Sequence, residues 1–244
     1  MRGVGQIVRF NWPFYGGGIA ALVAATVASA AMAGSVRLLA HSVIALAGFW
    51  MVASLVASWA VYDRSDLMRG DWIAPLFGAP PRTWINIHAG LDESSPALRR
   101  LFGSAGSRVF DIFDRTEMTE SSILRARRLA RNQVPAETVD YRHLPVGPAT
   151  TDAALLLLSA HELRHEEARL ALFRELARVL APGGCVVVAE HLRNWANFLA
   201  FGPGFLHFHS RRTWRRAFTR TAFTVDSEWS ITPFVRVFVL RRSS

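Results

Sequence analysis

The sequence predicts an α/β domain with a doubly wound, mostly parallel sheet, preceded by an α-helical transmembrane hairpin. Two uncharged apolar runs near the N-terminus predict the hairpin. Beyond them, short apolar runs alternate with helical patterns, which is typical of a parallel sheet with helices on both faces. One of these runs, residues 153–159, is continuously apolar, as expected for a strand covered on both sides.

Length and composition agree with one domain plus an extension. The chain has 244 residues, of which 51% are hydrophobic, and its mean hydropathy is +0.19. A compact domain usually has about 100–200 residues. The high apolar content indicates that part of the chain is solvated by lipid.

The two apolar runs cover residues 15–34 and 42–61, with residues 35–41 as the loop between them. Each run has the length of about 20 residues that a helix needs to cross a bilayer. The flanking arginines are Arg2, Arg9, Arg64 and Arg69, and the loop arginine is Arg37. The positive-inside bias therefore places both ends in the cytoplasm, which predicts an inner-membrane protein with a cytoplasmic catalytic domain.

Two other interpretations of the apolar runs stay open. The first run can be a secretory signal peptide, with a cleavage site at residues 28–30 or 31–33. Its many alanines and glycines also suit a buried helical hairpin of a soluble protein. The domain division predicted from the sequence is a hairpin over residues 1–61, a connector over 62–82 and a catalytic domain over 83–244.

Within the catalytic domain the pattern predicts seven strands and four helices in a fixed order. The strands are expected at residues 83–88, 108–113, 138–141, 153–159, 185–189, 224–231 and 235–241. The helices are expected at residues 96–102, 118–132, 166–180 and 212–220. A Pro-Gly-Gly turn at residues 182–184 should separate the third helix from the fifth strand.

The charge pattern favours a membrane surface over a nucleic acid. The net charge is +9, and every basic residue is an arginine. The arginines are scattered and form no basic stripe interleaved with aromatic residues, so no nucleic-acid partner is expected. The single cysteine, Cys185, lies in an apolar run and is expected to be a buried apolar residue in a reducing compartment.

Polar residues follow several of the predicted strands, where open α/β sheets bind ligands. The first strand leads into residues 86–93, which contain Gly90 and two acidic residues. Asp114 follows the second strand, Asp140 the third, and the pair His161-Glu162 the fourth. A carboxylate such as Asp114 can accept hydrogen bonds from both hydroxyls of a ribose. Gly90 as a turn residue and Asp114 as a helix cap are the simpler interpretations.

Two segments resemble the class I S-adenosylmethionine-dependent methyltransferases, particularly the quinone and small-molecule methyltransferases. Residues 177–184 (ARVLAPGG), followed by a strand and Glu190-His191, look like the RVLxPGG segment of that family. Residues 114–118 (DRTEM), with Ala126-Arg127 beyond them, are similar to its D-x-[ST]-x-E-M stretch. The resemblance spans residues 83–244 and implies a Rossmann-like fold that binds S-adenosylmethionine.

The glycine loop departs from the family pattern. Where the family has D/E-x-G-x-G-x-G, this chain has residues 86–92 (NIHAGLD), so only the middle glycine is kept. Histidine and aspartate replace the outer glycines, so the cofactor is expected either to lie slightly farther from the loop or to make side-chain contacts there. The residues expected around S-adenosylmethionine are Asn86, His88, Gly90, Asp92, Asp114 and Asp140.

The candidate acid, base or metal-binding groups are His161, Glu162, Glu190, His191, His207 and His209. His161 is the first candidate for a general base because an imidazole has an ordinary pKa near 6.5. Glu162 and His191 are the alternatives. No short metal-ligand spacing is present, so no metal site is expected.

These residues and the hairpin predict methyl transfer from S-adenosylmethionine to a hydrophobic or lipid-like acceptor at the cytoplasmic membrane face. The aromatic segment 195–205 is apolar enough to cover such an acceptor, to touch the bilayer or to belong to the core. The altered glycine loop leaves two alternatives. One is a membrane-bound cofactor-binding protein without methyl transfer, serving as a sensing or interaction module. The other is non-methyl chemistry, with a metal at His161 and His191.

Overall fold

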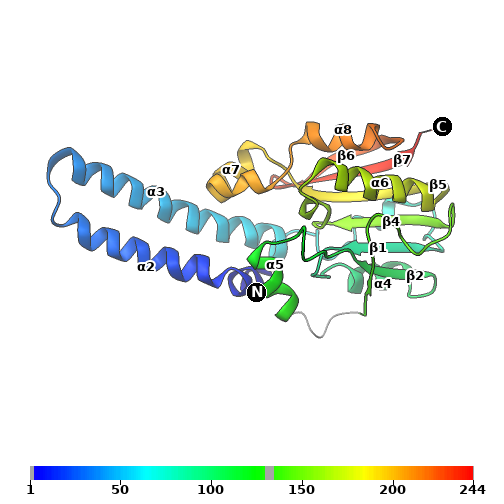
Figure 1. Ribbon diagram of the computed structural model, residues 1–244, viewed down its shortest axis with the longest axis horizontal. Helices are drawn as coiled ribbons and strands as arrows, with labels where there is room; N and C mark the ends of the chain where they lie inside the picture. The colour runs from blue at the N-terminus through cyan, green and yellow to red at the C-terminus, as the bar shows by residue number, and fades with distance from the viewer. Residues whose placement is uncertain (1–2, 130–134, 244) are drawn as a thin grey trace.

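The computed structural model describes residues 3–129 and 135–243 (Figure 1). A helical hairpin projects from one end of an α/β domain. It consists of α2 (Trp12–Ser29) and α3 (Gly34–Ser58), preceded by the short helix α1 (Gly3–Phe10). The helix α3 continues into a π-helical turn, η1 (Trp59–Arg64).

The chain turns between the two long helices at residues 30–33, earlier than the sequence predicts. The predicted loop, residues 35–41, therefore forms the first turns of α3. Within it, Nε2 of His41 lies 3.1 Å from the hydroxyl of Ser29, a hydrogen bond across the hairpin.

The hairpin is not buried against the rest of the molecule. Both helices are long and apolar enough to cross a membrane, and only 6% of the apolar window of α2 and 17% of that of α3 is buried. Large apolar side chains such as Val23, Leu38 and Val52 are exposed along them. These exposed side chains contradict the interpretation of the hairpin as the buried core of a soluble protein.

The sheet has seven strands in the order β3-β2-β1-β4-β5-β7-β6. Strands β1 to β5 run parallel to one another, whereas β7 is antiparallel to both β5 and β6. Their bounds are β1 Trp84–His88, β2 Ser107–Asp111, β3 Glu137–Thr138, β4 Thr151–Leu157, β5 Leu180–His191, β6 Phe223–Thr232 and β7 Val235–Arg242. The predicted doubly wound, mostly parallel sheet is confirmed.

Alternate residues of the central strands point to opposite faces of the sheet, and each face carries its own apolar core. One core joins the strands to α6 (Glu166–Val179) and α8 (Arg211–Thr219) through Phe173 and Trp214. The other joins them to α4 (Ser95–Phe102) and the segment after the hairpin. In that segment Leu67 and Ile73 are almost fully buried, so much of the predicted connector packs on the sheet.

Several element boundaries differ from the prediction. The strand β2 ends at Asp111 rather than at residue 113, and α5 is Ser121–Leu129, with residues 130–132 of the predicted helix outside the described residues. The Pro-Gly-Gly segment lies inside β5, which follows α6 directly. The aromatic segment after β5 forms α7 (Trp195–Phe201) and a 3-10 helix, η4 (Gly202–His207), neither of which the pattern predicts.

Candidate active site

The loop after β1 and the tip of β2 form a contact centred on Gly90. Gly90 has a φ of +89°, which favours glycine, and its N–H donates to Oδ1 of Asp111 at 2.9 Å. The other carboxylate oxygen of Asp111 accepts from the guanidinium of Arg127 on α5. A Cβ at Gly90 would lie 2.9 Å from Cγ of Arg127, so this side chain covers the bare backbone of the loop.

Asn86 on β1 and Asp92, just before α4, lie next to this contact. Oδ1 of Asp92 accepts from the backbone N–H groups of Ser94 and Ser95 at 3.1 and 2.9 Å. The amide of Asn86 donates to the same oxygen at 3.3 Å. These bonds hold the altered glycine loop against the helix, so aspartate in place of the last glycine has a structural role as well as a predicted binding role.

His88 is buried beneath the same loop. Neither ring nitrogen has a hydrogen-bond partner among the described residues, and Nδ1 lies 3.8 Å from Oδ1 of Asp111. Burial outweighs the attraction of the neighbouring carboxylates and lowers the pKa of His88. A neutral imidazole with free polar atoms beside a bare backbone can accept and donate hydrogen bonds to a ligand, so the loop fits an organic cofactor.

Asp114 and Asp140 do not join this contact. Oδ1 of Asp114 accepts from the backbone N–H and the hydroxyl of Thr116, at 2.8 and 2.6 Å. Oδ1 of Asp140 accepts from the backbone N–H of Arg142 at 2.8 Å, on the surface. Both carboxylates therefore stabilise their own turns. Asp114 is not the helix cap of the simpler interpretation, because α5 begins only at Ser121.

The acidic residue that stands at the tip of β2 beside Gly90 is Asp111. The sequence pattern does not single it out, because the apolar run continues to residue 113 and makes Asp114 the first acid after the predicted strand. A signal for Asp111 exists in the sequence: it is a charged residue within the apolar run VFDIF, which predicts a buried carboxylate with dedicated partners.

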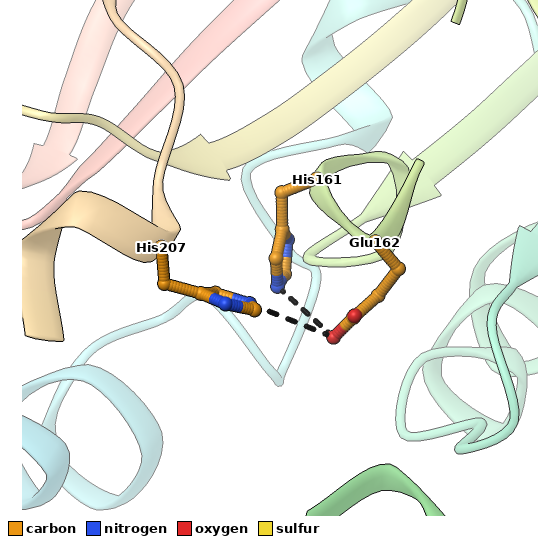
Figure 2. A group of neighbouring side chains, drawn as sticks. All are labelled: His161, Glu162 and His207. Carbon is orange, nitrogen blue, oxygen red and sulfur yellow. Dashed lines mark ion pairs between the residues drawn. The ribbon is translucent and has the colours of Figure 1, made fainter. Parts of the chain in front are cut away.

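A second group of charged residues lies at the tips of β4 and β5 (Figure 2). Glu190, near the end of β5, is fully buried, and its Oε1 accepts from the backbone N–H groups of residues 159–161 at 2.7 to 3.2 Å. Its Oε2 lies 2.6 Å from Nδ1 of His161. On the other side of that ring, Nε2 of His161 lies 3.4 Å from Oε1 of Glu162.

His161 is thus held between two carboxylates. Burial disfavours its imidazolium, but the charges of Glu190 and Glu162 outweigh burial and raise its pKa to about 10. The expectation that His161 is a general base depends on an ordinary histidine pKa, and this ring does not have one. Burial followed by the positive charge of His161 lowers the pKa of the neighbouring His207 to about 4.

His191 lies apart from this pair. Its ring stacks on Phe208 with centroids 4.8 Å apart, and its Nδ1 bonds to the carbonyl of Phe234 at 3.0 Å. The ring of Phe208 also lies edge-on to His161. The structure brings His161 and Glu162 together, whereas His191 belongs to the aromatic packing behind them.

The base of the hairpin, formed by α1 and the second half of α3, packs on the helices that follow β2 and β5. The guanidinium of Arg125 on α5 donates to the carbonyl of Phe10. On α3, Trp50 packs edge-on against Phe198 of α7, and a Cβ at Gly202 would lie 2.7 Å from the Trp50 ring. Because α5 and α7 begin beyond the carboxyl ends of β2 and β5, the hairpin is attached at the edge where ligands bind in such sheets.

Comparison of folds identifies the class of domain. A structure described as an S-adenosylmethionine-dependent methyltransferase from Aquifex aeolicus has a TM-score of 0.53 and 17% identity, covering 73% of this chain and 93% of that one. Geranyl diphosphate C-methyltransferase from Streptomyces coelicolor A3(2) has a TM-score of 0.50 and 16% identity, covering 71% and 78%. A putative methyltransferase from Haloferax volcanii, solved with its Trm112 activator, has a TM-score of 0.52 and 16% identity, covering 80% and 98%.

At these identities the structural likeness shows the fold, which is that of the class I methyltransferases. Residues 97–188 also match the family model described as a methyltransferase domain. The chain thus has the class I methyltransferase fold and a segment that matches a methyltransferase domain, and the resemblance predicted from the sequence is confirmed. No curated protein sequence matches the chain.

Proposed function

We propose that this protein transfers a methyl group from S-adenosylmethionine to a hydrophobic or lipid-like acceptor at the cytoplasmic face of the inner membrane. The observation that carries the proposal is the attachment of an exposed apolar hairpin at the ligand-binding edge of a methyltransferase domain. Next to its base, α7 and η4 expose Trp195, Leu199 and Leu206. Trp195 is 78% exposed, as suits a residue at a membrane interface.

The cofactor half of the site comprises the tips of β1 and β2. His88 and Gly90 would contact S-adenosylmethionine, Asn86 and Asp92 would hold the loop, and Asp111 is added to the predicted set. Asp114 and Asp140 stay in the proposal as outer residues of the cofactor site, beyond the contact at Gly90. When bound, the cofactor supplies an electrophilic methyl group on a sulfonium.

The acceptor half comprises the tips of β4 and β5, where His161 and Glu162 would face the acceptor. The chain has to align the acceptor with the methyl group and exclude water, because orientation supplies much of the acceleration in such a transfer. His191 would act through packing, since Phe208 separates it from His161. A solved neighbour of the same fold is named for a prenyl substrate, geranyl diphosphate, which supports an apolar acceptor.

The ion pair over the glycine loop favours one alternative, a membrane protein of this fold that does not transfer methyl groups. Arg127 covers Gly90 and holds Asp111, so S-adenosylmethionine can bind only if this side chain moves. If it does not move, the domain serves as a sensing or interaction module.

Calorimetry on the purified full chain with S-adenosylmethionine and S-adenosylhomocysteine separates these functions. Binding of both, with transfer of a radiolabelled methyl group into a lipid extract, is expected from the proposal. Binding without transfer would favour the module, and the absence of binding would contradict both.

Single-cysteine labelling tests the membrane topology. The native Cys185 is buried, so a membrane-impermeant maleimide should report only on an introduced cysteine. Ser35→Cys at the tip of the hairpin should react in intact cells, whereas the matched variant Ser104→Cys on the domain surface should react only after permeabilisation. The opposite pattern would overturn the orientation, and an N-terminus that mass spectrometry finds cleaved near residue 30 would support a signal peptide.

A further inference from the structure

Three side chains beyond the tips of β4 and β5 direct donor atoms at one point (Figure 2). His161 and Glu162 come from the 3-10 turn η3 (Ala160–Glu162), and His207 comes from the end of η4. Oε1 of Glu162 lies 3.4 Å from Nε2 of His161 and 4.0 Å from Nε2 of His207. Donor atoms of the three residues all lie within 4.8 Å of one another.

A carboxylate lies on the far side of each imidazole, within hydrogen-bond distance at His161 and as a longer ion-pair contact at His207. Nδ1 of His161 lies 2.6 Å from the fully buried Glu190, and Nδ1 of His207 lies 3.5 Å from Oε1 of Glu120. Each pair leaves the Nε2 atom pointing toward Glu162. Histidine ligands of metal ions are usually held in this way, with the nitrogen that does not bind the metal bonded to a carboxylate or carbonyl.

The cluster also holds two carboxylates although it is largely buried. Two carboxylates, Glu190 and Glu162, flank the 10% exposed side chain of His161. The second oxygen of Glu162 is buried without a hydrogen-bond partner among the described residues. The nearby Arg164 directs its guanidinium to the carbonyl of His207. The imidazolium of His161 balances part of this charge, and a cation bound by the three donor atoms would replace its Nε2 proton and balance the charge in its place.

We propose that His161, Glu162 and His207 bind one divalent transition-metal ion of the Zn²⁺ type through Nε2, Oε1 and Nε2. A tetrahedral ion with bonds of about 2.0–2.1 Å needs donors about 3.3 Å apart, so the His161–Glu162 distance already fits and His207 has to move inward. Two imidazoles and one carboxylate are a donor set that zinc accepts, with a fourth position open to water or an acceptor oxygen. The inference does not depend on methyl transfer.

Metal titration of the full chain tests this site directly. The tag-free protein in detergent micelles is stripped with a chelator, dialysed and titrated with Zn²⁺ by calorimetry. We expect one ion per chain, and Co²⁺ should give the intense visible absorption of a tetrahedral site. Zn²⁺ should bleach that absorption.

Matched histidine variants distinguish the site from adventitious binding. His207→Ala should weaken Zn²⁺ binding at least tenfold, whereas His143→Ala, at an exposed histidine outside the cluster, should leave it unchanged. Glu190→Gln should weaken binding about 10–100-fold, because it removes an orienting carboxylate. Circular dichroism of each variant verifies folding. Equal Zn²⁺ binding by folded wild type and folded His207→Ala, or no binding by the wild type, would overturn the proposal.

Discussion

At the tips of β4 and β5 a buried carboxylate, that of Glu190, is held by backbone amides, whereas at the tips of β1 and β2 the buried carboxylate of Asp111 is paired with a partly exposed arginine that lies over the glycine loop. Glu190 is fully buried and takes three N–H groups, and Arg127 is 33% exposed and pairs with Asp111 over the glycine loop. The acceptor half is therefore organised in advance. The cofactor half has to open, so the two halves should respond differently to substitution.

The largest effect is expected at Glu190. Replacing it with alanine leaves three buried N–H groups unpaired and removes one carboxylate from His161, so we expect a loss of about 3–5 kcal/mol in the free energy of unfolding. Denaturant titration in detergent measures it. Glu137→Ala, which breaks an exposed pair with Arg108, is the control and should lose less than about 1 kcal/mol. Equal losses would show that the acceptor half is no more rigid than the surface.

The next effect distinguishes the two acids near the tip of β2. Asp111→Asn keeps an oxygen for the N–H of Gly90 but loses the charge, and we expect S-adenosylmethionine binding to weaken by about 1–3 kcal/mol. Asp114→Asn, three residues further on, should change it by less than about 0.5 kcal/mol. Calorimetry measures both. A larger effect at Asp114 would show that Asp114, as the sequence predicts, contacts the ribose of the cofactor.

A pH effect is expected at Glu93, directly after the glycine loop. Burial, followed by the negative charge of Asp92, raises its pKa to about 7 from an ordinary value of 4.5. The unfolded chain releases this proton more readily, so the stability of the wild type falls relative to Glu93→Gln as the pH rises from about 4.5 to 7. We expect Glu93→Gln to be more stable by about 1–2 kcal/mol at pH 8, with no gain at pH 4.5. Thermal unfolding at both pH values measures it, and a gain at pH 4.5 alone would contradict a buried neutral carboxyl.

The sequence predicts the strands, the helices and the hairpin because apolar periodicity determines which residues are buried. It also locates His161 and Glu162, since they directly follow a strongly apolar strand. It does not predict Asp111, because a shift of two residues in a strand end changes which acid reaches the loop. The contact of Arg127 with Gly90 and that of His207 with Glu162 join distant segments, and only the packing of α5 and η4 brings them together.

The smallest effect tests whether the cofactor half has to open. Arg127 and Asp111 form a partly exposed ion pair, and such pairs contribute about 1 kcal/mol or less. If S-adenosylmethionine has to displace Arg127 from Gly90, then Arg127→Ala removes that step and should tighten binding by up to about fivefold. Arg128→Ala, at the exposed neighbouring position on α5, is the matched control and should leave the affinity unchanged. Weaker binding in Arg127→Ala would mean instead that the guanidinium holds the cofactor, which would make the cofactor half as organised in advance as the acceptor half.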